Sequence, residues 1–97
     1  MDDARSRLRQ ADQFARNGLL PEAVDAYLAA AFQFADGGFA LKAIATLRQV
    51  VSIVDRDAPE LVDARLQALQ RLVVLYSDLG LGEDAAATRK LLRPHAV

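Results

Sequence analysis

The sequence has no cysteine, no tryptophan and a single histidine among its 97 residues. The absence of cysteine excludes disulfides, thiolate chemistry and cysteine-based zinc sites. The histidine, His95, follows Pro94 near the end of the sequence and has no second histidine beside it to form a metal-binding pair. We therefore expect no metal and no other cofactor.

Residue patterns of catalytic sites are missing as well. Ser6, Ser52 and Ser77 have no histidine or lysine near them in the sequence. Gly37-Gly38 lacks the further glycines and the lysine of a phosphate-binding loop. The sequence therefore predicts a protein without enzymatic activity.

The sequence also has no excess of one charge and no long apolar run. Twelve Lys and Arg residues oppose 13 Asp and Glu residues, and a net charge of −1 favours neither nucleic acid nor an anionic membrane as a partner. No stretch approaches about 18 consecutive apolar residues, so we expect no membrane insertion. The start, Met1-Asp2-Asp3, is acidic where a secretory signal is basic, which favours a cytoplasmic protein.

What the sequence does contain is one spacing that occurs three times. Each copy places a small residue before an aromatic residue, then a glycine, then an alanine, with larger residues following at helical intervals. The copies are Ala11, Phe14, Gly18, Leu20, Ala23, Tyr27, Ala30; then Ala31, Phe34, Gly38, Ala40, Ala43, Leu47, Val50; and, degraded, Val73, Tyr76, Gly80, Gly82, Ala85, Arg89, Leu92. Intervals of three and four between apolar residues, interrupted by glycine, predict helices joined by tight turns.

The same periodicity predicts an all-α protein with one domain over residues 1–97. The predicted helices are residues 3–17, 21–36, 39–54, 59–79 and 83–92. Thr46 is expected to point outward from the third helix. Asp57 and Glu60 predict a capping box at the start of the fourth helix. The inward stripe expected on the fourth helix is Val62, Leu66, Leu69, Leu72, Val73 and Tyr76.

The repeated spacing resembles the tetratricopeptide repeat, in which a small residue, a ring, a glycine and an alanine stand at these offsets. The resemblance covers about residues 8–93 and implies antiparallel helical hairpins stacked as a right-handed solenoid. The family repeats about every 34 residues, whereas Gly18, Gly38 and Gly80 are unequally spaced. We therefore expect two hairpins, formed by the second and third helices and by the fourth and fifth, with the first helix as an extra half-repeat.

In this family, the first helix of each hairpin lines a groove that binds other proteins. Some relatives hold a peptide carboxylate there with Lys, Asn and Arg, a set that this sequence does not reproduce, so an apolar or helical ligand fits better. The resemblance places the partner-binding residues on the second and fourth helices, at Leu28, Phe32, Ala35 and Asp36 and at Gln67, Gln70, Arg71 and Val74.

Each of these surfaces has a simpler explanation. Phe32 is either a contact residue or is covered by the first helix or by the loop at Phe39, and the polar face of the fourth helix is either functional or merely solvated. A strip of Arg5, Arg9 and Arg16 either receives an acidic partner or pairs with Asp12 on the same helix.

Three functions are compatible with these patterns. The first is an adaptor or scaffold that binds a protein segment or helix in the groove. The second is a structural module that assembles with itself through apolar residues of the second and fifth helices. The third is a small chaperone that shields an apolar helix of a partner. In each case another molecule would cover some of the Leu, Val, Phe and Tyr residues, which are more numerous than five short helices need for themselves.

Overall fold

Five α-helices follow one another along the chain in the computed structural model, which describes residues 3–93. They are α1 (Ala4–Arg16), α2 (Leu20–Asp36), α3 (Ala40–Asp57), α4 (Val62–Asp78) and α5 (Gly82–Leu92). No strand occurs within residues 3–93, so the all-α prediction is confirmed. His95, to which no role was assigned, lies outside the described residues.

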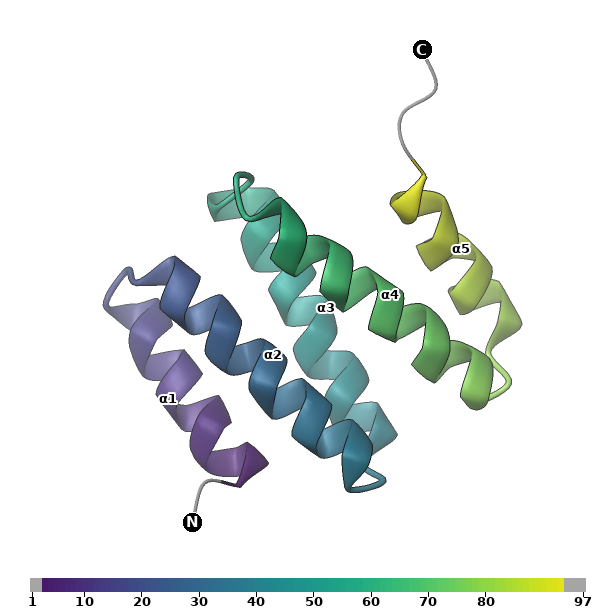
Figure 1. The fold of residues 1–97 in the computed structure, drawn as a ribbon, viewed down its shortest axis with the longest axis horizontal. Coiled ribbons are helices and arrows are strands. Elements are labelled where there is room, and N and C mark those ends of the chain that lie inside the picture. The colour runs from purple at the N-terminus through teal and green to yellow at the C-terminus, as the bar shows by residue number, and fades with distance from the viewer. Residues whose placement is uncertain (1–2, 94–97) are drawn as a thin grey trace.

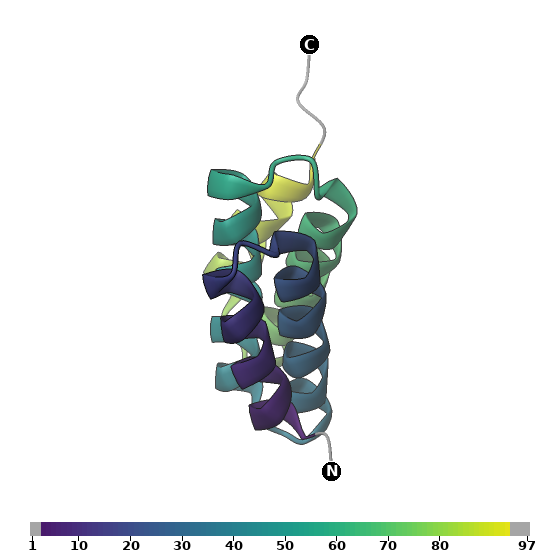
Figure 2. The same cartoon turned by 90° about the vertical axis from the view of Figure 1, so that its left-hand side faces the viewer.

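The helices are arranged in two layers. Each helix packs antiparallel against the next one along the chain, and α2 also contacts α4 (Figure 1). Seen from the side, α1, α3 and α5 form one layer and α2 and α4 form the other (Figure 2). The Cα atoms accordingly extend over 38 × 33 × 14 Å. A flat arrangement of this kind gives the protein two broad faces, one formed by α2 and α4 and one by the other three helices.

Helix α2 lies at the centre of the packing. It contacts α1, α3 and α4, which explains why its sequence is apolar on nearly every side. Tyr27 on α2 and Leu47 on α3 are fully buried, and both occupy the same position of the repeated spacing. At that position of the third copy stands Arg89, which is exposed on α5 because no further helix among the described residues covers it.

The three glycine turns share one hydrogen-bonding pattern. Gly18, Gly38 and Gly80 have φ angles of 75°, 85° and 76°. In the first turn the Gly18 amide donates to the carbonyl of Ala15, and the Leu19 amide donates to the carbonyl of Phe14 at 2.9 Å. The same two bonds recur in the other turns. These are Schellman motifs, which require a left-handed residue that glycine adopts without strain.

The turn after α4 allows a direct test of this requirement. Gly80→Ala is expected to lower the free energy of unfolding by about 1–2 kcal/mol, because an L-residue is strained at a φ of 76° even though a Cβ there would meet nothing within 4 Å. Gly82→Ala, which also adds its Cβ to open space but in the first turn of α5, is expected to stabilise by about 0.4–1 kcal/mol. Urea unfolding followed by circular dichroism measures both, and equal effects of the two substitutions would contradict the assignment.

The junction between α3 and α4 differs from the prediction. Helix α3 continues through Asp57 to a C-cap at Ala58, so Asp57 forms no capping box with Glu60. Helix α4 begins only at Val62, and its N-cap residue, Leu61, provides no side-chain cap. Residues 55–57, predicted to be a connection, therefore extend α3, and residues 59–61, predicted to be helical, form the connection to α4.

The orientation of two side-chain sets also differs from the prediction. Thr46 is buried rather than outward, and its hydroxyl is satisfied by donating to the carbonyl of Lys42 at 2.8 Å. On α4, Val62 and Leu66 are exposed. The buried residues of α4 are Ala68, Leu69, Leu72 and Leu75. The stripe that faces the core is therefore rotated relative to the predicted one.

Candidate binding groove between α2 and α4

A groove runs between α2 and α4 on the face that these two helices form. It consists of two adjoining hollows of about 500 and 280 Å³ that share Phe32 and Gln67. The first is lined by Asp25, Leu28, Ala29, Phe32, Glu60, Leu61, Val62, Asp63, Ala64 and Gln67, and the second by Phe32, Gln67, Gln70, Arg71 and Val74. We call the two hollows together the α2/α4 groove.

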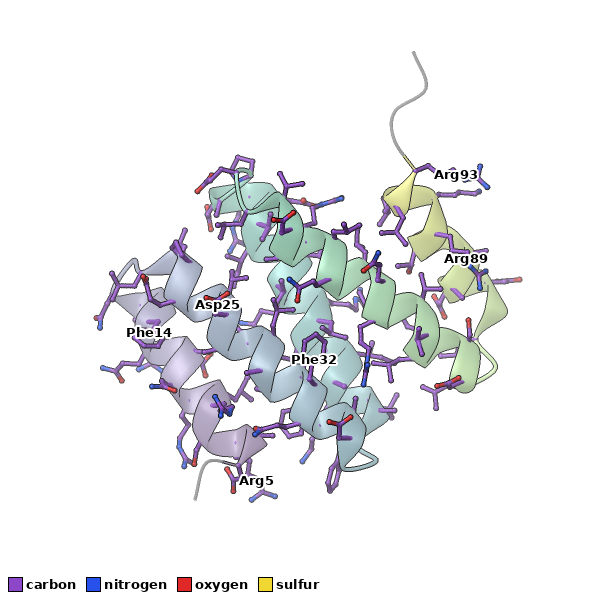
Figure 3. All side chains as sticks on the ribbon, viewed as in Figure 1. Arg5, Phe14, Asp25, Phe32, Arg89 and Arg93 are labelled. Carbon is purple, nitrogen blue, oxygen red and sulfur yellow. The ribbon has the colours of Figure 1, made fainter. Side chains whose placement is uncertain are left out.

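Phe32 lies at the middle of this groove. Its side chain is half-buried, and Figure 3 shows it between α2 and α4. The guanidinium of Arg71 lies 5.4 Å from the centre of the ring, and the same guanidinium pairs with the Asp36 carboxylate at 3.5 Å. Phe32 is therefore held partly by a cation from α4 and remains open to the two hollows on either side.

Two aliphatic side chains of α4 provide most of the remaining exposed apolar surface. Val62 is 63% exposed at one end of the groove, and Val74 is 50% exposed at the other. Leu28, which was predicted to contact a partner, is only 6% exposed and belongs to the core, so it contributes to the floor of the groove and not to its rim. Ala35 lines neither hollow.

One end of the groove is acidic. Asp25 from α2, Glu60 from the turn before α4 and Asp63 from its first turn all line the larger hollow and are exposed. None of the three forms an ion pair within residues 3–93. At the other end, the positive charge of Arg71 is offset by Asp36. The groove therefore presents an uncompensated negative charge beside an apolar floor.

The structure brings together most of the residues that the sequence pattern selected. Phe32, Gln67, Gln70, Arg71 and Val74 line the groove, and Asp36 is tied to it through Arg71. Sequence analysis missed Val62, Asp63 and Glu60. Val62 was assigned to the core, and the two acids were missed because Glu60 was assigned to a helix cap and the start of α4 was placed one turn too early.

The arginine strip of α1 is separate from this groove. Arg5, Arg9 and Arg16 are exposed, and no carboxylate within residues 3–93 pairs with them. Pairing within α1 had been the alternative, but the Asp12 carboxylate instead accepts a hydrogen bond from the hydroxyl of Tyr27 on α2. Arg9 donates to the Ser6 hydroxyl at 3.3 Å, and the charges of Arg9 and Arg5 add to the Ser6 amide hydrogen bond in lowering the pKa of Asp3. None of the three guanidinium groups, however, forms a close ion pair within residues 3–93.

Residues 3–93 show neither a metal-binding cluster nor a membrane-spanning helix. The described residues hold no group of three or more His, Cys, Asp or Glu side chains that could bind a metal ion. Nor does any helix in the described part of the chain have the length and apolar character needed to cross a bilayer. No family model matches the chain, and no curated protein and no solved structure matches it either.

Proposed function

We propose that this chain is a non-enzymatic adaptor of the tetratricopeptide-like solenoid type, which binds a segment of another protein in the α2/α4 groove. The observation that carries the proposal is the coincidence of two independent selections. The family resemblance chose eight residues on α2 and α4 from their offsets, and six of them line one groove that also carries exposed apolar side chains.

The arrangement of the helices supports the solenoid part of the proposal. In stacked helical hairpins each unit contacts only its neighbours along the chain. Here the contacts are those between consecutive helices, together with the contact between α2 and α4. These two helices take the place of the first helices of two hairpins, and α1 takes the place of a preceding second helix.

The chemistry of the groove favours an amphipathic helix with basic residues at one end. Phe32, Val62 and Val74 offer an apolar track along the groove, which suits residues repeating along one face of a helix. The unpaired carboxylates of Asp25 and Asp63 would attract Lys or Arg at one end of such a ligand. Gln67 and Gln70, which lie between the apolar positions of the groove, can hydrogen-bond to the polar edge of the bound helix.

This proposal predicts a loss of binding when the exposed aliphatic residues become polar. The double variant Val62→Gln/Val74→Gln is expected to bind a fluorescein-labelled amphipathic Leu/Lys model helix at least tenfold more weakly, because both apolar contacts are removed at positions that do not support the fold. Fluorescence anisotropy titration measures the dissociation constant.

Leu41→Gln/Leu91→Gln is the matched control. It also replaces two exposed aliphatic side chains, and neither lies in the α2/α4 groove. It should bind the helix within twofold of the unmodified chain. Equal losses in both double variants would show nonspecific hydrophobic attraction and reject the site.

Light scattering over a concentration series distinguishes binding of a foreign helix from self-assembly. If the unmodified chain forms a dimer and Val62→Gln/Val74→Gln breaks that dimer, a second copy of the chain fills the groove.

A further inference from the structure

A second groove opens on the opposite face, between α1 and α3. It comprises two hollows of about 330 and 420 Å³ that share Arg5 and Phe34. Side chains of α1 and α3 form its walls, and Phe34 of α2 lies at its floor together with Leu8 of α1. We call these hollows the α1/α3 groove. It shares no lining residue with the α2/α4 groove.

The walls of the α1/α3 groove are basic. Arg5 on one wall and Lys42 on the other are exposed, and neither has an ion-pair partner within residues 3–93. Arg9 and Arg16 lie on the same stripe of α1 as Arg5, within about 40° around the helix axis at 3.6 residues per turn. The one carboxylate on that stripe, Asp12, is engaged by Tyr27. Asp3 at the mouth of the groove caps α1 by accepting from the Ser6 amide at 2.8 Å, and its carboxylate offsets part of the charge of Arg9 and Arg5, which help to lower its pKa.

The floor of the groove is aromatic and apolar. The Lys42 ammonium lies 5.8 Å from the centre of the Phe34 ring and 5.3 Å from that of Phe39. Phe39 is more than half exposed, and its ring meets Phe34 edge-on at 6.5 Å. A cation held over two rings, with an unpaired arginine across the groove, provides both a charge and an apolar surface for one ligand.

We propose that the α1/α3 groove binds an acidic segment of a partner protein that carries apolar side chains between its carboxylates. The carboxylates pair with Arg5 and Lys42, while a leucine or phenylalanine side chain enters the hollow above Leu8 and Phe34. This site is independent of the proposed function, since an adaptor that binds a basic helix on one face can hold an acidic segment on the other. The opposite charges of the two grooves prevent the ligands from exchanging places.

A charge-reversed variant tests the proposal. The probe is a labelled 14-residue peptide of Glu and Asp with Leu and Phe at every third or fourth position, and its control carries Gln and Asn in place of the acids. Arg5→Glu/Lys42→Glu is expected to weaken binding of the acidic peptide at least tenfold. Arg89→Glu/Lys90→Glu, which makes the same charge change on exposed residues of α5, should stay within twofold. Binding by the unmodified chain should weaken as salt rises from 50 to 300 mM.

Several outcomes would overturn this assignment. Equal losses of affinity in the two double variants would mean that the peptide responds to the overall charge of the protein and not to the α1/α3 groove. Equal affinity for the uncharged control peptide would mean that Arg5 and Lys42 do not contribute to binding. Stronger binding of a single-stranded oligonucleotide of the same charge would make the groove a phosphate site. A salt-sensitive dimer disrupted by Arg5→Glu/Lys42→Glu would make a second copy its occupant. Circular dichroism checks folding, and Arg5→Gln/Lys42→Gln replaces the reversed variant if that variant does not fold.

Discussion

Truncating Leu47 to alanine is expected to lower the free energy of unfolding by about 2–5 kcal/mol, which is a large part of the stability of a small domain. Leu47 has no exposed surface and belongs to the main core cluster on α3, the helix that joins α2 to α4. The substitution removes buried methyl groups and leaves a cavity that helices on both sides of α3 must collapse to fill. Urea unfolding followed by circular dichroism at 222 nm gives the change.

Leu41→Ala provides the control within the same helix. The chemical change is identical, but Leu41 is 73% exposed, so its effect should remain within about 0.5 kcal/mol. A comparable loss in both variants would mean that helix propensity, and not burial between neighbouring helices, accounts for the effect. A small loss for Leu47→Ala would contradict the packing of α3 between α2 and α4.

The turns were the most predictable part of this fold, because each depends on a few residues close in sequence. Glycine is selected wherever φ is positive. In the second turn the Phe34 carbonyl accepts the Phe39 amide at 2.8 Å, and the two rings are in contact, which is the apolar contact that often accompanies a Schellman motif. In this turn the aromatic residue four positions before the glycine therefore has a local role in addition to its place in the core.

The rotation of α4 could not be obtained in the same way. Apolar residues occur around most of its circumference, so two stripes of similar hydrophobicity compete. The predicted stripe included Val62 and Leu66, whereas the structure buries Ala68 and Leu75. The difference arises because α4 packs on α3, α5 and α2 at once, and those directions are set by tertiary packing and not by the local pattern.

The charge of each groove could not be predicted from the net charge of the sequence for a similar reason. A net charge of −1 is a sum over the whole chain and contains no information about faces. Folding places Asp25 and Asp63 beside one groove and Arg5 and Lys42 beside the other. Net charge therefore does not predict the charge of either face, and the expectation that it gave, of neither nucleic acid nor an anionic membrane as a partner, stays a prediction.

Alkaline pH is expected to destabilise the protein through Tyr27 in particular. Burial, and then the hydrogen bond to the Asp12 carboxylate, raise the pKa of Tyr27 from 10.0 to about 12. The raised pKa means that the neutral phenol is favoured in the folded state, so its contribution is complete below pH 10 and is lost as the pH rises toward 12. The expected loss across this interval is about 2–3 kcal/mol. Unfolding by urea at pH 9 and at pH 11.5, compared with Tyr27→Phe, measures most of it.

The second tyrosine makes the measurement specific. In Tyr76→Phe the remaining phenol is Tyr27, so absorbance at 295 nm follows its ionisation alone. The folded variant should ionise near pH 12, and the urea-unfolded variant near pH 10. Tyr76→Phe should also keep the alkaline loss of stability, whereas Tyr27→Phe should lack it. Ionisation of the folded variant near pH 10 would show that Tyr27 is accessible to water, and the contact between α1 and α2 through Asp12 would then be wrong.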